Sequence, residues 1–576
     1  MIIQILEQKF LAALHSAFPH LSETSIEITA ATQKQFGHYQ CNAAMKLTKI
    51  LKMPPQKIAA EIINHLNADD IFEKTEIAGP GFINITLTTA FLEKELNSML
   101  LDPMLGVERE KPKKVIVEFS SPNTAKELHV GHLRSTIIGD SIARLFEFLG
   151  HNVLRLNHVG DWGTQFGMLI AYMKERYPKV LTGEQHTDLS YLVKWYKESK
   201  LLFDSDPEFK KRSQLTVVDL QSGDPNCIKA WEVLCAISRE AYQEIYDLMG
   251  IKLIERGEST YNAMLPNIVK ECEEKGIVTL SNGAKCIFLD GFTNREGEPL
   301  PMILQKSDGG YNYDTTDMAA MKQRTREEKA DQIIIITDAG QSLHFQMLEK
   351  AAQLAGYLDP KQVQFNHVVF GMVLDQSGKK FRTRSTDTEK LLDLLTAAIE
   401  KAKEIVEERA LEMSEEEKLE LAKKLGLGAI KYSDLSSHRT SDYTFSYEKM
   451  LKFEGNTAPF LLYSYVRVSG IKRKIGSDIE QLKQKAAIKI NHPSEIDLGL
   501  HLCRFSECLK AFKNELLPNR LAEYLFELAH YFNAFYRDCT VEGSKEQEAR
   551  LLLCELTAQV MEKGLHLLGL QTVQRM

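Results

Sequence analysis

The stretch Val115–Gly167 reads VIVEFSSPNTAKELHVGHLRSTIIGDSIARLFEFLGHNVLRLNHVGDWGTQFG. Its first residues, Val115–Phe119, form an apolar run rich in β-branched side chains, which is typical of a buried strand. Apolar residues then recur at helical spacing over Leu133–Leu149, and Gly150 is a helix stop. Val153–Val159 reads as a second strand. Strand, helix and strand within about 45 residues predict a βαβ crossover, in which ligands bind beyond the carboxyl ends of the strands.

The loop Ser120–His132 lies at that position and ends in His129-Val-Gly-His132. Gly131 lets a nucleotide approach the backbone, the helix N-terminus favours anions, and the imidazoles can donate to developing charge. The chain has no G-x-x-x-x-G-K-[ST], so a nucleotide site here would not be a P-loop. A turn with two solvated histidines is the alternative interpretation.

Two segments carry a family resemblance: Glu118-Phe-Ser-Ser-Pro-Asn-Thr-Ala-Lys126 and His129-Val-Gly-His-Leu-Arg-Ser135. They resemble the nucleotide-binding segment of the arginyl-tRNA synthetase family, whose class I HIGH-type tetrapeptide is often HVGH. The similarity continues through Asn157–Gly167 and recurs to the last residue. It implies an α/β fold: a Rossmann-like parallel-sheet catalytic domain with an insertion, a small N-terminal α/β domain and a C-terminal all-helical domain.

The resemblance also implies an activity and its partners. ATP and L-arginine give arginyl-adenylate and pyrophosphate, and the arginyl group then passes to the 3′-terminal adenosine of tRNA(Arg). The attacking carboxylate needs no general base, so catalysis should rest on positioning and charge stabilisation, with Mg²⁺ on the phosphates. Two rivals are another class I synthetase, such as the cysteinyl enzyme, and a non-enzymatic tRNA-binding paralogue. A thiol-selecting site would want metal ligands, and none are spaced for it.

The composition is that of a globular chain with more than one core: 576 residues, 44% hydrophobic and 26% charged. The nine cysteines are odd in number and form no C-x-x-C pair, which indicates reduced thiols in a cytoplasmic protein and no metal site. The N-terminal residues 1–18 read as an amphipathic helix and not as a signal or transit peptide. No apolar run is long enough to span a membrane. A net charge of -8 means that tRNA would need local basic patches.

The expected domain organisation has four parts, and we expect a monomer. Residues 1–110 form an N-terminal domain that binds the corner of the tRNA, and residues 111–385 form the catalytic domain. The catalytic domain carries an insertion at about 172–290, for which the sequence indicates only solvated helices. Residues 386–450 form a helical connecting region, and residues 451–576 form the anticodon-binding domain.

The N-terminal part is expected to contain two helices and two short strands: Ile2–Phe18, Lys57–Leu66, Ile26–Ile28 and Ile83–Leu87. By resemblance, Phe82 stacks on an unpaired D-loop base and Asn84 hydrogen-bonds it. That Phe82 is instead a core residue of a hairpin stays open.

The second half of the sheet is expected at Asp331–Thr337 and His367–Gly371, which are apolar strand-like runs. Tyr313-Asp-Thr-Thr-Asp317 opens the helix before them, with Asp314 as its N-cap. A carboxylate at Asp317 needs no function, because it favours the helix dipole. By resemblance, however, Tyr313 and Asp317 hold the substrate guanidinium together with Glu118, since carboxylates pair with it bidentately.

The resemblance assigns the remaining site residues. Asn123 and Gln341 contact the α-amino end of arginine, and His344 belongs to the same segment as Gln341. The arginine-binding set is therefore Glu118, Asn123, Tyr313, Asp317 and Gln341. The ATP-binding set is His129, Gly131, His132, His344, Lys379, Lys380 and Arg384. The catalytic set is His129, His132, Lys126 and Lys380.

The basic segment Gly378–Ser385 follows a strand, where class I enzymes place their KMSKS loop. Lys380 can serve as its first lysine, but Thr383 stands where the second is expected. In the arginyl family a lysine ahead of the HIGH-type motif, here Lys126, appears in its place. A solvated surface loop is the alternative interpretation.

The chain from Thr386 onward reads as helical, and its end resembles the anticodon-binding domain of the family down to Met576, which joins the tRNA-binding set with Phe82 and Asn84. Aromatic residues interleave at helical spacings: Tyr524, Phe526, Tyr531, Phe532, Phe535 and Tyr536. Such a stripe is either core or a base-stacking platform.

Overall fold

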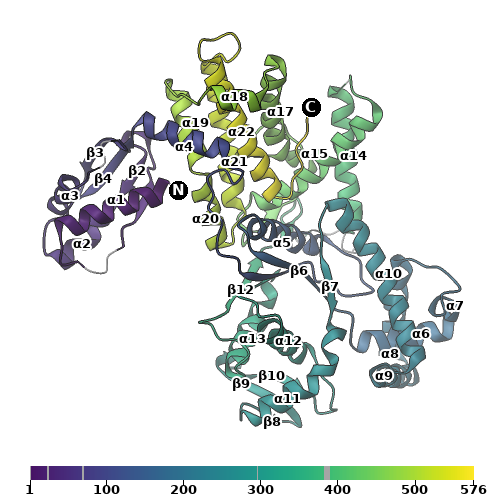
Figure 1. Ribbon diagram of the computed structural model, residues 1–576. Helices are drawn as coiled ribbons and strands as arrows, with labels where there is room; N and C mark the ends of the chain where they lie inside the picture. Colours follow the sequence, from purple (N-terminus) through teal and green to yellow (C-terminus); the bar gives the residue numbers. More distant parts are fainter. Residues whose placement is uncertain are drawn as a thin grey trace. The chain divides into compact units, whose positions relative to one another are not determined.

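The structure is a computed structural model that describes residues 2–21, 25–67, 70–294, 296–379, 381, 390–410 and 412–576 (Figure 1). The chain divides into two compact units. One combines Met1–Arg109 with Lys452–Met576, and the other is Glu110–Leu451. Over the described residues, no helix is long and apolar enough to cross a membrane.

The unit Glu110–Leu451 is built on a five-stranded sheet in the order β12-β11-β5-β6-β7. Its strands are β5 Lys114–Glu118, β6 Asn152–Val159, β7 Ile254–Gly257, β11 Gln332–Asp338 and β12 Gln364–Phe370. All four pairings are parallel. Helix α5, Val130–Phe148, makes the crossover from β5 to β6. The apolar run Val115–Val117 is fully buried, as in a sheet covered on both faces, so the predicted Rossmann-like α/β fold is confirmed.

Five helices separate β6 from β7: α6 Thr164–Arg176, α7 Pro178–Leu181, α8 Leu189–Ser205, α9 Pro207–Ser222 and α10 Pro225–Met249. After β7 come η2 Glu258–Met264, α11 Leu265–Glu274 and a three-stranded antiparallel sheet of β8 Thr279–Ser281, β9 Ala284–Thr293 and β10 Pro299–Gln305. The expectation that 172–290 is only helical is therefore wrong from residue 254 onward. Strand β7 is a short edge strand with an exposed start, so it lacks the apolar run that marks buried strands.

Helix α12, Tyr313–Lys322, continues into a π-helical turn, η3, Gln323–Glu327. The predicted N-cap is wrong: Asn312 caps the helix, and its side-chain oxygen accepts the backbone N–H of Asp314 at 3.2 Å. Asparagine serves as well as aspartate in this role, and sequence spacing does not separate the two.

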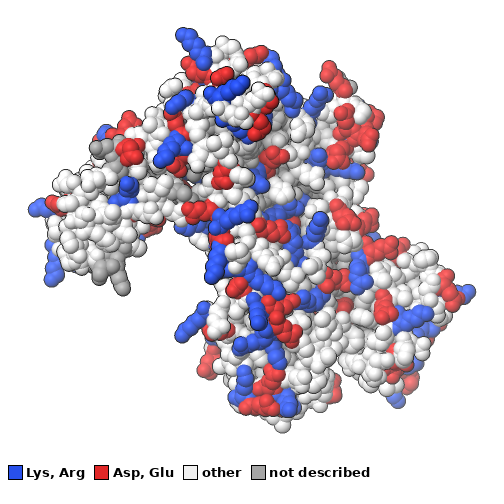
Figure 2. All heavy atoms as spheres, viewed as in Figure 1, with Lys and Arg blue, Asp and Glu red and all other residues white. Residues whose placement is uncertain are grey.

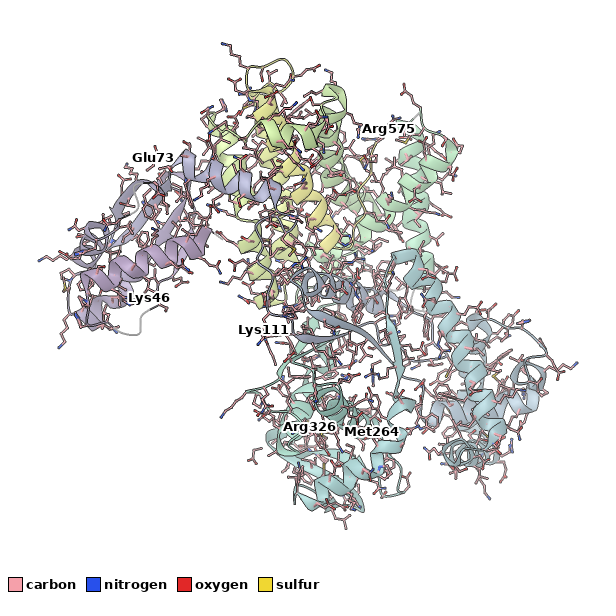
Figure 3. All side chains as sticks on the ribbon, in the orientation of Figure 1. Lys46, Glu73, Lys111, Met264, Arg326 and Arg575 are labelled. Atoms are coloured by element: carbon pink, nitrogen blue, oxygen red, sulfur yellow. The ribbon has the colours of Figure 1, made fainter. Side chains whose placement is uncertain are left out.

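The remaining elements of this unit are η4 Ala339–Gln341, α13 Ser342–Leu354, β13 Val373–Leu374, α14 Leu391–Arg409, α15 Glu415–Leu435, β14 Tyr443–Thr444 and α16 Tyr447–Met450. Figure 3 shows side chains filling the space between the sheet and its helices.

The other unit begins with an antiparallel sheet in the order β1-β2-β4-β3. Its N-terminal elements are α1 Ile2–Ala17, β1 Ile28–Ala30, η1 Lys34–Phe36, β2 Tyr39–Cys41, α2 Ala43–Leu51, α3 Pro55–Asn64, β3 Phe72–Ala78, β4 Phe82–Leu87 and α4 Thr89–Leu101. The first strand starts at Ile28, where the sequence predicted it to end.

Six helices complete this unit: α17 Ala458–Ile475, α18 Ile479–Lys485, α19 Pro493–Cys503, α20 Phe505–Glu515, α21 Asn519–Asp538 and α22 Gln547–Leu567. They pack on the N-terminal part, where Tyr39 donates to Glu507 at 3.0 Å. Of the aromatic stripe on α21, Tyr524, Phe532 and Phe535 are core residues, whereas Tyr536 is exposed. The core interpretation is therefore confirmed for three positions only.

Candidate active site

The loop after β5 is held in a strained conformation. Ser120, Ser121 and Ala125 have φ angles of 71°, 46° and 61°, in the left-handed region that non-glycine residues rarely adopt. Side chains of α5, β6 and α10 accept their three backbone N–H groups: Ser135 Oγ (3.0 Å), Asn157 Oδ1 (3.0 Å) and Ser238 Oγ (3.1 Å). Strain of this kind persists where the surroundings over-determine the backbone, and it is common at functional sites.

Asn123 lies against the backbone at the carboxyl end of β6. A Cβ atom on Gly160 would lie 2.1 Å from Asn123 Oδ1, so the position tolerates only glycine without a shift. Gly160 also donates its N–H to Pro122 O at 3.0 Å, and Tyr242 donates its hydroxyl to Asn123 O at 2.8 Å. The loop is thus fixed to the edge of the sheet where ligands bind.

His129 and His132 form a capping box at the start of α5. Nδ1 of His129 accepts from Gly131 N at 3.0 Å, and Nδ1 of His132 accepts from His129 N at 3.1 Å. Their ring centroids are 4.1 Å apart. Because both Nδ1 atoms accept, each neutral ring carries its proton on Nε2. The alternative of two solvated histidines does not describe this pair, because both rings are engaged in the cap and both residues are half-buried.

Burial lowers the pKa of His132 to about 3, and the charges of His129 and Lys126 act in the same direction. His132 is therefore a neutral donor at physiological pH. Lys126 is exposed, and its ammonium lies 5.9 Å from the centroid of the Tyr196 ring.

Of the basic segment Gly378–Ser385, the structure describes residues 378, 379 and 381, and the description resumes at Lys390. Phe381 donates to Val373 O at 3.0 Å, and Lys390 pairs with His129 in an isolated β-bridge. Lys379 is exposed, with its N–H bonded to an Asp375 carboxylate oxygen at 3.0 Å. The predicted site residues Lys380 and Arg384, and the threonine at 383, lie outside the described residues.

A second group of polar residues surrounds His344, in the first turn of α13. Nε2 of His344 is 2.6 Å from Asp317 Oδ2, and Nδ1 is 3.2 Å from Asp314 Oδ1. Burial alone would lower the pKa of His344, but hydrogen bonds to Asp314 and Asp317 raise it to about 9. The ring is therefore an imidazolium at neutral pH. Tyr313 is largely exposed, and its ring centroid lies 5.0 Å from that of His344.

Glu118 is buried at the end of β5 and is paired with Arg324 from the π-helical turn. The atoms Glu118 Oε2 and Arg324 Nη2 are 2.5 Å apart. Burial opposes the charge of Arg324, but Glu118, Tyr261 and Asp317 hold its pKa above the usual range. Arg324 was not expected from the sequence, since it lies in a Lys/Arg-rich helical run that is typical of a solvated face.

The carboxylates therefore outnumber the cations by one. Three carboxylates (Glu118, Asp314 and Asp317) face two resident cations (Arg324 and His344). Burial, followed by Asp317 and Asp161, raises the pKa of nearby Glu258 to about 8, so this carboxyl is mostly protonated at neutral pH. Among these five described groups, the two cations and three carboxylates have a formal charge of -1, which suits a ligand carrying a single positive charge.

Comparison with known proteins places the chain in a family. The model "tRNA synthetases class I (R), catalytic domain" matches residues 95–447, more than half of the chain. The models "Arginyl tRNA synthetase N terminal domain" and "DALR anticodon binding domain" match residues 4–87 and 461–576. The chain belongs to the arginyl-tRNA synthetase family.

Relatives and solved structures agree with this assignment. An arginine–tRNA ligase of Protochlamydia amoebophila is 58% identical, and the match covers 100% of both chains. The arginyl-tRNA synthetase of Plasmodium falciparum superposes with a TM-score of 0.87 at 35% identity, covering 100% of this chain and 99% of that one. The Thermus thermophilus arginyl-tRNA synthetase shares the fold, with a TM-score of 0.82 at 24% identity and 100% coverage of both chains.

The synthetase residues predicted to bind tRNA lie in the other unit. Phe82 is the first residue of β4, next to the turn that joins it to β3, and it is half-buried. Its ring is therefore neither fully buried in the core nor fully exposed to solvent. Asn84 is buried, and its side-chain oxygen accepts from Gln40 at 2.7 Å. Met576 is half-buried at the end of the chain. In the catalytic unit, predicted Gln341 is exposed in η4.

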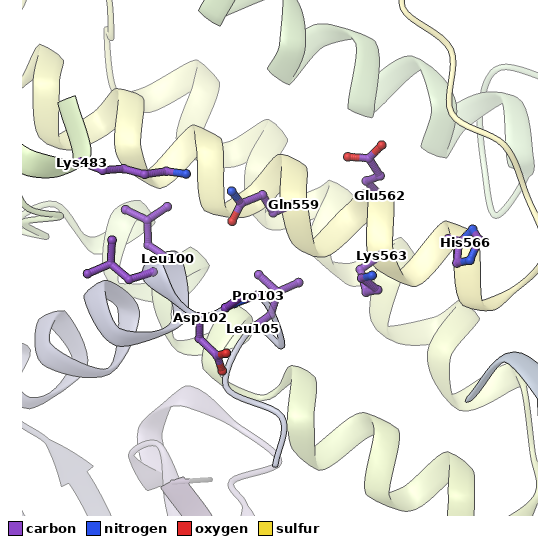
Figure 4. Close-up of a pocket in the computed structure, with 10 residues that line it drawn as sticks. Leu100, Asp102, Pro103, Leu105, Lys483, Gln559, Glu562, Lys563 and His566 are labelled. Atoms are coloured by element: carbon purple, nitrogen blue, oxygen red, sulfur yellow. The ribbon is translucent and has the colours of Figure 1, made fainter. Parts of the chain in front are cut away.

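The unit that combines Met1–Arg109 with Lys452–Met576 contains a cavity of about 530 Å³. It lies between the end of α4 and α22, and Figure 4 shows Leu100, Asp102, Lys563 and His566 around it. On the face drawn in Figure 2, Lys and Arg side chains are interspersed with Asp and Glu. A polyanion would therefore find local basic patches and no extended basic surface on this face.

Proposed function

We propose that this chain is an arginine–tRNA ligase: it activates L-arginine with ATP and transfers the arginyl group to the 3′-terminal adenosine of tRNA(Arg). The single observation that carries the proposal is the cluster of Glu118, Asp314 and Asp317, which has one uncompensated negative charge in a chain of the arginyl-tRNA synthetase family. A guanidinium supplies the positive charge that would balance it.

Adenylate formation is attack of the arginine carboxylate on the α-phosphorus of ATP, with pyrophosphate as the leaving group. The carboxylate is already ionised, so the protein has to align it and stabilise charge on the phosphates. His129 and His132 donate Nε2–H to the phosphate oxygens, and His132 does so as a neutral ring. Lys126 and Lys380 supply the positive charge, and Lys126 takes the role of the lysine that Thr383 replaces. The position of Lys126 in the same loop, three residues before His129, supports this role.

The proposed arginine pocket consists of Glu118, Asn123, Tyr313, Asp317 and Gln341. The guanidinium lies between Asp317 and Glu118, with Tyr313 at the mouth. Asn123 and Gln341 bind the α-amino group at the carboxyl ends of the strands. Lysine brings the same charge without the planar fork, so lost bidentate geometry accounts for its rejection.

The proposed ATP contacts are His129, Gly131, His132, His344, Lys379, Lys380 and Arg384. Among the described residues, no three His, Cys, Asp or Glu side chains converge on a point that would hold a metal ion. We propose that magnesium would accompany ATP on its phosphates, as is usual for this cation at phosphate sites.

The proposed tRNA contacts are Phe82, Asn84 and Met576. We keep the assignments of residues 1–110 to the tRNA corner, 111–385 to catalysis, 386–450 to a connecting region and 451–576 to the anticodon. We further propose a monomeric, cytoplasmic enzyme. All nine cysteines are free thiols and eight of them are buried, which is compatible with a reducing compartment.

ATP–pyrophosphate exchange tests the proposal. The assay is run across the twenty amino acids, with and without tRNA(Arg). We expect exchange with arginine alone among them. Exchange driven by another amino acid, or none with arginine in the presence of tRNA(Arg), would refute the proposal.

A further inference from the structure

A histidine occupies the place where the substrate cation is expected. The ring of His344 lies between Asp314 and Asp317, with one nitrogen 3.2 Å from the first carboxylate and the other 2.6 Å from the second. Asp317 is the residue that the proposed function gives to the guanidinium. One of its oxygens is therefore already engaged before arginine arrives.

The other oxygen of Asp317 has a weaker neighbour. Nε2 of His158, on β6, is 3.8 Å from Asp317 Oδ1, beyond hydrogen-bond distance. A planar guanidinium binds a carboxylate through both oxygens. Bidentate pairing therefore requires His344 to release Oδ2 of Asp317.

We propose that His344 is a positioning residue of the arginine pocket: it holds Asp317 in the free enzyme and yields that carboxylate to the guanidinium while it stays bonded to Asp314. This inference rests on the proposed function, and it moves His344 from the ATP contacts to the arginine pocket. Asp314 is suited to be the fixed partner because it is buried and its other oxygen accepts from Ile303 N at 3.1 Å.

The exchange couples arginine binding to a proton. With the guanidinium beside it, the imidazolium of His344 meets a second cation and loses one carboxylate, so its pKa falls from the value of about 9 in the free enzyme. Arginine then binds more tightly to the deprotonated form. Arginine affinity rises as the pH increases through the titration of His344, and binding near pH 8 releases a proton.

Other titratable groups face the same space from each packed element. They are Tyr313, Asp314 and Asp317 on α12, Arg324 on η3, His158 on β6, Glu258 on η2 and His367 on β12; Arg324 stays charged at neutral and mildly alkaline pH. Glu258 titrates near 8 and its ionisation would also favour a cation. Burial, then the charge of His344, lowers the pKa of His367 to about 4, so His367 stays neutral above pH 6. A test has to separate His344 from Glu258.

The test measures the arginine KM in pyrophosphate exchange between pH 7 and 9.5, with tRNA(Arg) present. The proteins are the wild type, His344→Gln, Glu258→Gln and the control His367→Gln, which removes a neighbouring imidazole that contacts no carboxylate of the pocket. Dividing the wild-type KM by that of each variant cancels the titration of the substrate α-amino group. For His344→Gln we expect this ratio to fall by about fivefold or more across the range, a typical size for coupled sites. For His367→Gln it should stay constant.

Two results would overturn the inference. One is a ratio that stays constant with pH for His344→Gln, and the other is a pH dependence of the arginine KM that is lost in Glu258→Gln but kept in His344→Gln. If His344→Gln does not fold, calorimetry of arginine binding to the wild type is decisive. In two buffers of different ionisation enthalpy at pH 8, release of roughly half a proton or more is expected beyond that of the α-amino group. No excess release refutes the inference. Absence of arginine-dependent exchange in the wild type would instead refute the proposed function.

Discussion

Replacement of Asp317 by asparagine tests the central electrostatic argument. The variant keeps the shape of the side chain and removes one of the three carboxylates that face the two resident cations. A unit charge pair at about 4 Å, with an effective dielectric constant near 20, is worth about 4 kcal/mol. The Asp317 side chain is 20% exposed, so solvent screening reduces the loss to about 2–4 kcal/mol. At 1.36 kcal/mol per tenfold, arginine kcat/KM should fall by about 30- to 900-fold.

The assay is arginine-dependent pyrophosphate exchange together with the melting temperature of the same protein. If Asp317 only anchors His344, the melting temperature falls and the arginine kinetics do not change. The matched control is Glu328→Gln, since Glu328 is 18% exposed and pairs with Arg256 at 2.7 Å, but does not contact His344. It should lose stability and keep its arginine KM within about threefold, because surface-connected pairs contribute about 1 kcal/mol or less. Normal arginine kinetics in Asp317→Asn would remove Asp317 from the site.

The remaining predictions concern the loop and the cap. His132→Ala should lower the single-turnover rate of adenylate formation by about 100-fold or more with little change in arginine affinity, since its donor acts on developing charge; a near-normal rate contradicts this role. Lys126→Ala should impair activation about as much as Lys380→Ala, and normal exchange in the former would show that Lys126 does not replace the missing lysine. Gly160→Ala places a Cβ atom 2.1 Å from Asn123 Oδ1, so arginine kcat/KM should fall by about 5- to 150-fold. An unaffected Gly160→Ala enzyme would mean that Asn123 does not bind the amino acid in this position.

The parts that the sequence determined depend on short-range signals. The β-branched run at Val115–Phe119 and the helical spacing after it fix a strand and a helix through local backbone preference and burial. The same holds for His129 and His132, because a capping box joins residues three positions apart. Its position between a strand and a helix also locates the binding edge of the sheet. The family resemblance then assigned expected roles to the side chains at that edge.

The tertiary structure decided what contacts those side chains. Glu118 and Arg324 are 206 positions apart, and His344 is 27 positions from Asp317, so no periodic pattern relates them. The strand β7 joins the parallel sheet at its edge, where partial exposure removes the apolar signal. Whether a carboxylate is free, paired with an arginine or bonded to an imidazolium depends on which elements the sheet order brings together. The sequence therefore specified the loop proposed to bind the nucleotide, whereas the charge balance of the proposed arginine pocket arises only when β5, α12, η3 and α13 meet.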